Sequence, residues 1–139
     1  MLRFALFGLV LACAHPAPEP PVDAVKLLIE SAVPQIHAAL ADEAPRRGFV
    51  RVDSRADATL RVESTATFYA QVAGRYRWEV TSRVELRAAD HTWTRTLQTP
   101  VFLVYYHERE PEALAAAAPA LQRKVGTLLD EWRREAALP

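Results

Sequence analysis

The sequence feature that most constrains the fold is a long alternation of apolar and polar residues over Asp57–Asp90. Even-numbered positions from Leu60 to Leu86 are mostly apolar or small, whereas odd-numbered positions from Arg61 to Arg87 are mostly charged or polar. A period of two that continues this far predicts two β-strands with one buried face and one solvent-exposed face.

The same alternation predicts how the two strands pair. A three-residue loop, Val72-Ala73-Gly74, with Gly74 in the left-handed conformation would place buried-face residues opposite one another. Opposite charges then also meet on the exposed face, so loop, burial and charge favour one register. The predicted pairs are Leu60–Leu86, Val62–Val84 and Phe68–Trp78 on the buried face, and Arg61–Glu85 and Glu63–Arg83 on the exposed face.

The first twelve residues, Met1–Ala12, predict a secretory signal peptide. Arg3 precedes an apolar run too short for the ~30 Å hydrocarbon core of a bilayer, which takes about 20 helical residues. Val10-Leu11-Ala12-Cys13 resembles the bacterial lipobox, in which the signal is cut before a cysteine that receives lipid. We expect Cys13, the one cysteine, to be lipidated. The alternative is an ordinary signal peptide with an incidental cysteine.

Residues 13–21 are interpreted as the lipidated cysteine and a tether, followed by a single domain over residues 22–139. Ala14–Pro21 holds four of the ten prolines, and eight extended residues at ~3.1 Å each would span ~25 Å. By resemblance to Gram-negative sorting rules, Ala14 predicts the outer membrane, with the domain facing the periplasm.

Composition argues against a nucleic-acid partner. The chain has 17 Lys and Arg against 17 Asp and Glu, and loss of residues 1–12 removes only Arg3, leaving 16 against 17. A protein that binds the phosphate backbone should carry a clear basic excess.

The segment Val22–Ala44 leaves two interpretations open. Apolar residues from Val25 to Leu40 follow one helical stripe, but an interior Pro34 costs about 3 kcal/mol or kinks the helix. We favour a kinked helix, which leaves no strand before the first helix. In the alternative, Ala24–Glu30 is a strand and a shorter helix starts near Pro34. In both interpretations Phe49–Val52 is a short strand that leads toward the hairpin.

The stretch His91–Tyr106 is predicted to return as a further strand or pair of strands. A two-residue turn at Ala89-Asp90 would pair Trp93 with Leu86, Leu97 with Ser82 and, turned inward, Arg95 with Val84. Arg95 and Pro100 suggest an edge strand protected against stray pairing.

Val101–Tyr106 is the most apolar run after the signal. We favour a buried strand end or a loop beneath the last helix, because most such runs belong to the core. The alternative is a partner-binding patch.

The final helix opens at Pro111, which suits the first helical position. Its apolar stripe is long enough to cover the buried face of the sheet. The stripe consists of Leu114, Ala118, Leu121, Val125, Leu128 and Trp132. The fold class is therefore α+β: a two-layer sandwich with an antiparallel β meander, a long central hairpin and two helices packed on one face.

We expect no enzyme, metal site or cofactor. His15, His37, His91 and His107 have no second ligand at metal-binding spacing, no serine lies in a nucleophile elbow, and no glycine-rich phosphate loop exists. The acidic pair Asp53 and Asp57 lacks any flanking signal of a pocket.

The exposed face of the hairpin is the candidate partner-binding surface. A solvated face is the default interpretation, but Tyr and Arg are favoured interface anchors. The candidate residues are Tyr69, Arg77, Glu79, Arg83 and Arg87.

The layout from Val22 to Trp132 resembles a group of small envelope lipoproteins. It is similar to the LPS-assembly lipoprotein, to auxiliary lipoproteins of ABC-type lipid transporters and to the TolB N-terminal domain. The stretches that carry the resemblance are Leu40–Val62 with RGFVRVDSRADATLRV, Tyr76–Leu86 and Pro111–Trp132. The resemblance implies a non-catalytic docking subunit of lipid or lipopolysaccharide transport, with a β-barrel or transporter subunit as partner. The alternative is a structural or regulatory lipoprotein of a secretion or cell-wall-synthesis complex.

Overall fold

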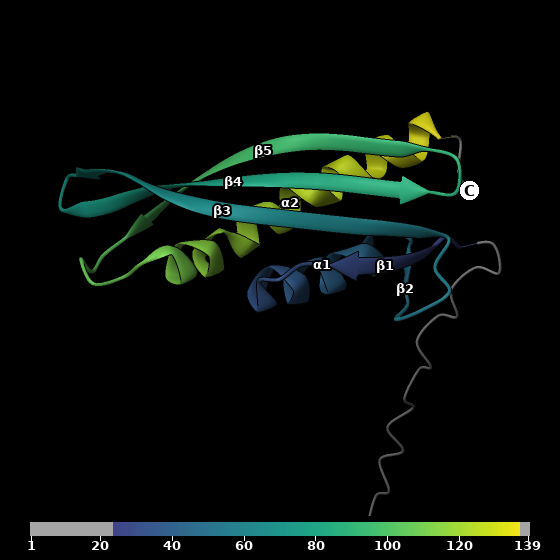
Figure 1. Ribbon diagram of the computed structural model, residues 1–139, viewed down its shortest axis with the longest axis horizontal. Helices are drawn as coiled ribbons and strands as arrows, with labels where there is room; N and C mark the ends of the chain where they lie inside the picture. Colours follow the sequence, from purple (N-terminus) through teal and green to yellow (C-terminus); the bar gives the residue numbers. More distant parts are fainter. Residues whose placement is uncertain (1–23, 137–139) are drawn as a thin grey trace, which may run out of the picture.

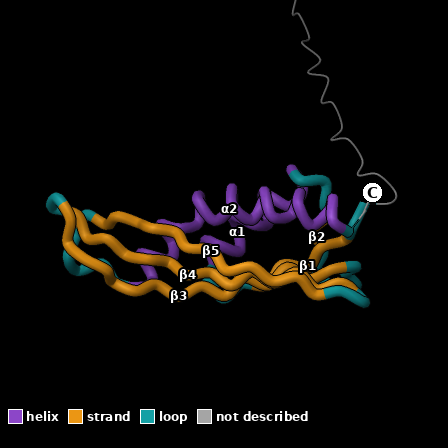
Figure 2. Tube along the Cα trace, turned by 90° about the horizontal axis from the view of Figure 1, so that it is seen from above, coloured by secondary structure: helices purple, strands orange, loops and turns teal. Residues whose placement is uncertain are grey.

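One open sheet of five strands in the order β2-β1-β3-β4-β5 forms the first layer of the fold. Two helices form the second layer, and Figure 2 shows both on the same face of the sheet. The computed structural model describes residues 24–136, so the predicted signal peptide, Cys13 and the tether lie outside the described residues. The elements are β1 (Lys26–Glu30), α1 (Pro34–Arg46), β2 (Val50–Arg51), β3 (Ala58–Val72), β4 (Arg75–Ala88), β5 (Thr92–Leu103) and α2 (Glu110–Glu135).

The expected sandwich is confirmed, with one addition to the sheet. β3, β4 and β5 form the antiparallel meander, while β1 runs parallel to both of its neighbours, β2 and β3. The short strand expected at Phe49–Val52 is present as β2 and lies at the edge beside β1.

The favoured kinked helix over Val22–Ala44 is wrong. Lys26–Glu30 is a strand, and the helix begins at Pro34. Proline fits the start of a helix, where its missing N–H costs nothing, whereas an interior position would cost about 3 kcal/mol. Val25 and Ile29 are buried as predicted, but they alternate with the exposed Lys26, as in a strand.

The predicted register of the central hairpin is confirmed in all five named pairs, from Leu60–Leu86 to Phe68–Trp78. The predicted three-residue loop is wrong. Val72 pairs with Arg75, and the turn has two residues, Ala73 with φ 49° and Gly74 with φ 75°. Two-residue hairpin turns of type I′ require positive φ at both positions. A bulge between Phe68 and Ala70 absorbs the one-residue difference, so the two faces exchange residues beyond it.

The β4–β5 pairing is also confirmed. Leu86 faces Trp93, Ser82 faces Leu97 and Val84 faces Arg95, and the main-chain N–H of Ala88 donates to His91 O across the predicted two-residue turn. Arg95 lies on the helix-side face but remains exposed, because its guanidinium stacks 4.3 Å from the centre of the Trp93 ring at the sheet edge.

The helices complete the core. All six residues of the predicted α2 stripe, from Leu114 to Trp132, are buried, while the helix itself starts one residue before Pro111. These α2 side chains pack against the helix-side residues of β3 and β4, including Leu60, Val84 and Leu86. α1 adds Ile36 and Leu40 beside β1.

The two helices also share a buried polar contact that the sequence pattern did not predict. Glu43 of α1 is 6% exposed and accepts hydrogen bonds from Arg47 Nε at 2.7 Å and Gln122 Nε2 at 3.2 Å. Arg47 also reaches Asp130 of α2 at 2.5 Å. Hydrogen bonds to Glu43 and then to Asp130 raise the pKa of Arg47 above its ordinary value. Gly126 leaves room for this contact.

Replacing Gly126 with Ala should destabilise the protein by about 1–3 kcal/mol through overpacking, although Ala is the better helix former. A Cβ at this position would lie 2.6 Å from Glu43 Oε1 and 2.8 Å from Arg47 Nε. Urea unfolding measures the difference. Thr127→Ala, at the exposed neighbouring position of α2, is the control and should be neutral or slightly stabilising. A Gly126→Ala protein as stable as this control would contradict the close approach.

Candidate functional site

The structure separates the five predicted partner-binding residues into two groups on the exposed face of the hairpin. Near the hairpin turn, Arg77 stacks 4.5 Å from the centre of the Tyr69 ring and pairs with Glu79 at 2.6 Å. Arg83 and Arg87 lie farther along β4, on either side of Glu85. The predicted set is therefore not one site but two.

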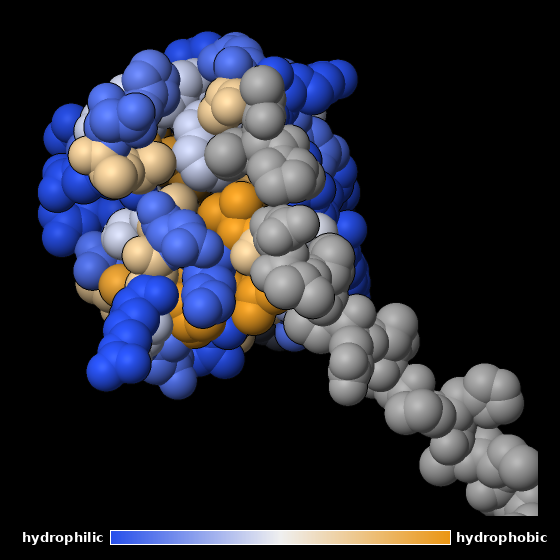
Figure 3. Space-filling view, turned by 90° about the vertical axis from the view of Figure 1, so that its right-hand side faces the viewer, coloured by the Kyte–Doolittle hydropathy of each residue, from blue (hydrophilic) through white to orange (hydrophobic). Residues whose placement is uncertain are grey.

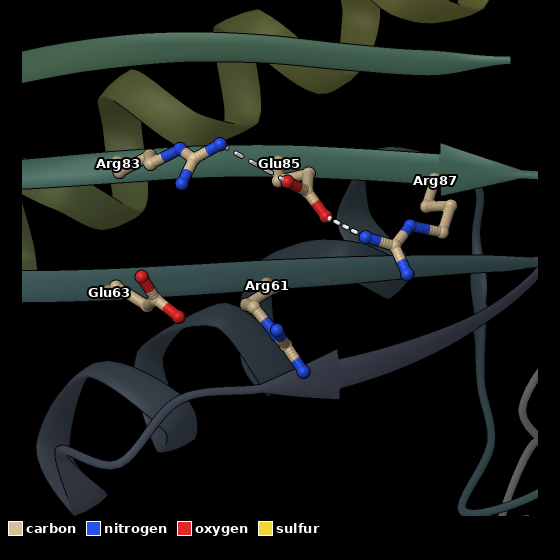
Figure 4. Close-up of a pocket in the computed structure, with 5 residues that line it drawn as sticks. All are labelled: Arg61, Glu63, Arg83, Glu85 and Arg87. Atoms are coloured by element: carbon tan, nitrogen blue, oxygen red, sulfur yellow. Dashed lines mark hydrogen bonds and ion pairs between the residues drawn. The ribbon is translucent and has the colours of Figure 1, made fainter.

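Arg83 and Arg87 belong to a charged hollow on the sheet face that the helices leave uncovered (Figure 4). The hollow has a volume of about 230 Å³ and is lined by Arg61, Glu63, Arg83, Glu85 and Arg87. We call these five residues the charged face. Its floor is the β3–β4 ladder, which brings alternating charges of two strands side by side.

The ion pairs on the charged face are not formed between the residues that lie opposite one another on β3 and β4. Glu85 pairs with Arg87 at 2.7 Å and Arg83 at 3.6 Å along its own strand, while Arg61 turns to Glu30 of β1 at 2.9 Å. The hydrogen bond to Glu30 raises the pKa of Arg61 above its ordinary value. Exposed pairs of this kind add little stability. A partner could exchange them for pairs of its own.

A second surface lies at the hairpin end of the molecule. All the large apolar side chains that are exposed in residues 24–136 gather there, with exposed fractions from 46% to 75%. We call this set the apolar tip: Phe68, Tyr69, Val72, Phe102, Val104, Tyr105 and Tyr106. In Figures 1 and 2 the hairpin turn and the loop after β5 both lie at this end.

The apolar tip changes the interpretation of Val101–Tyr106. Val101 and Leu103 are buried as favoured, but Phe102, Val104, Tyr105 and Tyr106 are exposed. The alternation of β5 sends Phe102 outward opposite Arg77, and the strand ends before the last three residues. The alternation of this run was the signal that could have divided it into buried and exposed positions.

The apolar tip has its own hollow on the helix side of the sheet. It has a volume of about 260 Å³ and is lined by Phe68, Tyr76, Trp78, Tyr106, Glu108 and Arg109. Phe68 and Trp78 meet edge to face with ring centres 5.7 Å apart. A neighbouring hollow of about 410 Å³ lies between the first turns of α1 and α2 and includes Val33, Pro34, Pro111 and Leu114.

Hydrogen bonds hold the loop of the apolar tip against α2. Glu108 Oε2 accepts the Tyr105 N–H at 3.0 Å, and Arg109 Nη1 donates to Tyr106 O at 2.7 Å. Glu112 Oε2 accepts the Arg109 N–H at 2.8 Å and closes the capping box of α2. The aromatic side chains are thus presented by a bonded loop.

β5 is an edge strand of the sheet, as predicted. Its free edge is partly protected against pairing with a strand of another chain. The Ala88–His91 hydrogen bond places the even-numbered residues of β5 with their main-chain groups toward the free edge. At this edge, Lys124 Nζ donates a hydrogen bond to Gln98 O at 2.5 Å, so this acceptor is already used. Pro100 has no N–H, so it cannot donate to an added strand.

Within residues 24–136 no group of three or more His, Cys, Asp or Glu side chains could hold a metal ion. His107 lies against the rings of Tyr105 and Tyr106, far in the sequence from His37 and His91.

The end of the molecule opposite the apolar tip is mainly hydrophilic. Figure 3 views this end and shows charged and polar side chains around a smaller hydrophobic area. The described chain starts here, at Ala24 before β1 (Figure 1). None of the described helices combines the length and the apolar character needed to cross a bilayer.

Comparison with known proteins identifies the fold. No protein-family model and no curated protein sequence matches the chain. The chain is similar to a minor lipoprotein from Acinetobacter baumannii, with a TM-score of 0.50 and 15% identity over 73% of this chain and 92% of that one. The two proteins therefore share a fold.

Two other solved structures are similar at lower scores. One is a candidate lipoprotein from Caulobacter crescentus CB15, with a TM-score of 0.44 and 17% identity over 82% of this chain and 92% of that one. The other is a PelC dodecamer from Paraburkholderia phytofirmans, with a TM-score of 0.39 and 17% identity over 72% of this chain and 84% of that one. Neither score is high enough to support an argument.

The capping box predicts a specific acid sensitivity. The hydrogen bond from the Arg109 N–H lowers the pKa of Glu112 below its ordinary value. The ionised Glu112 carboxylate therefore stabilises the folded protein at pH values above the pKa that Glu112 has in the unfolded chain. This stabilisation is lost as the pH falls through the lower pKa that Glu112 has in the folded protein. In Glu112→Gln, the free energy of unfolding should fall less between pH 6 and pH 3 than in the wild type. Urea unfolding at each pH measures this, and parallel curves would contradict it.

Proposed function

We propose that this protein is an outer-membrane lipoprotein of a Gram-negative bacterium, anchored through Cys13 and facing the periplasm. In this proposal it is a non-catalytic docking subunit in envelope lipid or lipopolysaccharide transport. Its membrane contact is the lipid on Cys13, and its protein partner is a β-barrel or a transporter subunit. Three features support the proposal: the lipobox-like Val10-Leu11-Ala12-Cys13, the fold shared with a minor lipoprotein, and the uncovered charged face.

The charged face is the observation that carries the docking role. It is a hollowed surface on a rigid two-strand ladder, and both signs of charge line it. Its charges include Arg83, 60% exposed at the side chain, and Arg87, 63% exposed. Charge patterns of this kind favour a partner with the complementary pattern and reject partners with like charges in register. Figure 4 shows these side chains on the two neighbouring strands, with the helices behind them.

The docking role predicts the effect of reversing two charges. Arg83→Glu with Arg87→Glu, in a tagged chain at its native level, should reduce recovery of the partner from gently solubilised envelopes at least tenfold. Mass spectrometry should find a β-barrel or lipid-transporter subunit in stoichiometric amount with the wild type. Arg123→Glu with Arg134→Glu, both at exposed positions of α2, adds the same negative charge and is the matched control; it should recover the partner normally.

Two results would contradict the proposal in different ways. Equal recovery with the doubly reversed chain would mean that the charged face is only a solvated surface. Stoichiometric recovery of secretion or cell-wall-synthesis machinery in place of a transport subunit would exclude the transport role and favour a structural or regulatory lipoprotein.

Lipidation has its own test. Replacing Cys13 with Ala should abolish incorporation of a palmitate analogue and block removal of the signal peptide, because the lipobox cut is made before the lipidated cysteine. Because Cys13 is the one cysteine, no other thiol can accept the lipid in its place. A Cys13→Ala chain that remains membrane-bound and fully processed would overturn the anchor.

A further inference from the structure

We propose that the apolar tip is a dimerisation surface, at which a second copy of this chain docks tip to tip. The apolar tip comprises all seven of the large apolar side chains exposed in residues 24–136. It is separate from the charged face, and the inference does not depend on lipidation or on the transport role.

The exposed area of the apolar tip matches what a stable dimer needs. Aromatic side chains offer about 150–250 Å² each, so the exposed fractions give a total exposed area on the order of 700 Å², most of it apolar and the remainder from tyrosine hydroxyl and main-chain groups. A typical specific interface buries about 800 Å² per partner, and the largest apolar patch of a monomer is usually about 300–600 Å². The exposed area of the apolar tip is thus close to the area that one partner of a specific interface buries.

The residues of the apolar tip form one connected surface. Tyr69 lies against Arg77, and Arg77 faces Phe102 across the β4–β5 ladder. On the helix side, Phe68 and Tyr106 line the same hollow. The surface thus wraps from the outer face of the sheet, around its end, to the helix side.

The charges around the apolar tip suit a partner with the same surface. Three arginines and four glutamates lie beside it, so charges of both signs border the surface and two copies bring little net charge together. Most of them are satisfied within the chain: Arg77 by Glu79, Arg109 by the carbonyl oxygen of Tyr106, and Glu108 by the N–H of Tyr105. Burying the aromatic groups therefore leaves few charges stranded, which is the usual condition for an apolar homodimer interface. The seven charged residues are Arg75, Arg77, Glu79, Glu108, Arg109, Glu110 and Glu112.

The hollow gives the pairing a specific contact. Its volume of about 260 Å³ accommodates one aromatic side chain, and Tyr105 is 60% exposed without lining it. In a two-fold arrangement, each copy would place its Tyr105 in the hollow of the other, so that the same contact is made twice. Tyrosine in a central pocket is a common energetic anchor of interfaces.

The first experiment is photocrosslinking in intact cells. The full chain is co-expressed in two tagged forms, with a photoreactive phenylalanine analogue in place of Tyr105. Irradiation should give an adduct of twice the mass of the chain that carries both tags. The analogue in place of Thr94, exposed on β5 and outside the apolar tip, is the control and should give none. No adduct from position 105, or an adduct with a different protein or with lipid alone, would overturn the proposal.

The second experiment measures the dimer directly. The full chain is studied by sedimentation equilibrium in a density-matched detergent. Tyr105→Ser with Phe102→Ser should raise the dimer dissociation constant about a hundredfold, because each loss occurs twice in a two-fold interface. The single substitution Tyr105→Phe, which keeps the aromatic ring, is the control and should dimerise as the wild type does. Unchanged melting temperatures would exclude misfolding, and a monomeric wild type would overturn the proposal.

The two proposals fail separately. Arg83→Glu with Arg87→Glu should dimerise as the wild type does, even where it loses the transport partner. Loss of the dimer in that variant would show that the copies meet at the charged face, and so would contradict the tip as the interface.

Discussion

The geometry of this protein depends on a difference in rise between strand and helix. A β-strand advances about 3.3 Å per residue and a helix 1.5 Å, so the 15 residues of β3 extend ~50 Å, while the 13 residues of α1 extend only ~20 Å. The 26 residues of α2 reach farther, to ~39 Å, but form a single rod. The two helices therefore cannot cover the whole sheet. The hairpin end remains uncovered, and the apolar tip lies there.

The covered half relies on an unusually close contact between its two helices. Glu43 is buried, yet its carboxylate is shared by Arg47 and Gln122, and Arg47 also holds Asp130. Breaking a buried pair of this kind by removing one partner is costly, because it leaves a buried charge unpaired. The contact fixes α1 against α2, and α1 in turn holds β1 and β2 in place at the edge of the sheet.

The central hairpin could be predicted from the sequence because three independent signals agreed on its register. The bulge and the two-residue turn could not, since together they leave every pair from Leu60 to Phe68 unchanged. The strand β1 was missed because Val25 and Ile29 are spaced by four residues, a spacing that a helical stripe and an alternating strand both allow. Pro34 was the residue that could have decided between them.

The two candidate surfaces differed in how far the sequence could indicate them. The residues of the charged face were visible as polar positions of the alternation, and the register placed Glu63 beside Arg83 and Arg61 beside Glu85. The apolar tip was hidden in part, because apolar residues are expected to be buried. The alternation of β5 could have placed Phe102 on the outer face, whereas the exposure of Phe68 on the helix side depends on where the helices end. Glu43 was hidden for the opposite reason: a glutamate on a helix is expected to be exposed.

The position of β1 has a mechanical consequence. This strand follows directly on the start of the described chain, and it lies between β2 and β3, parallel to both. The hydrogen bonds Val50 N–H to Val25 O and Asp57 N–H to Lys26 O join it to both sides. A pull on the chain at Ala24, along the strand, would load these bonds together in shear instead of opening them one at a time. The domain is thus arranged to resist a force applied at Ala24 along β1.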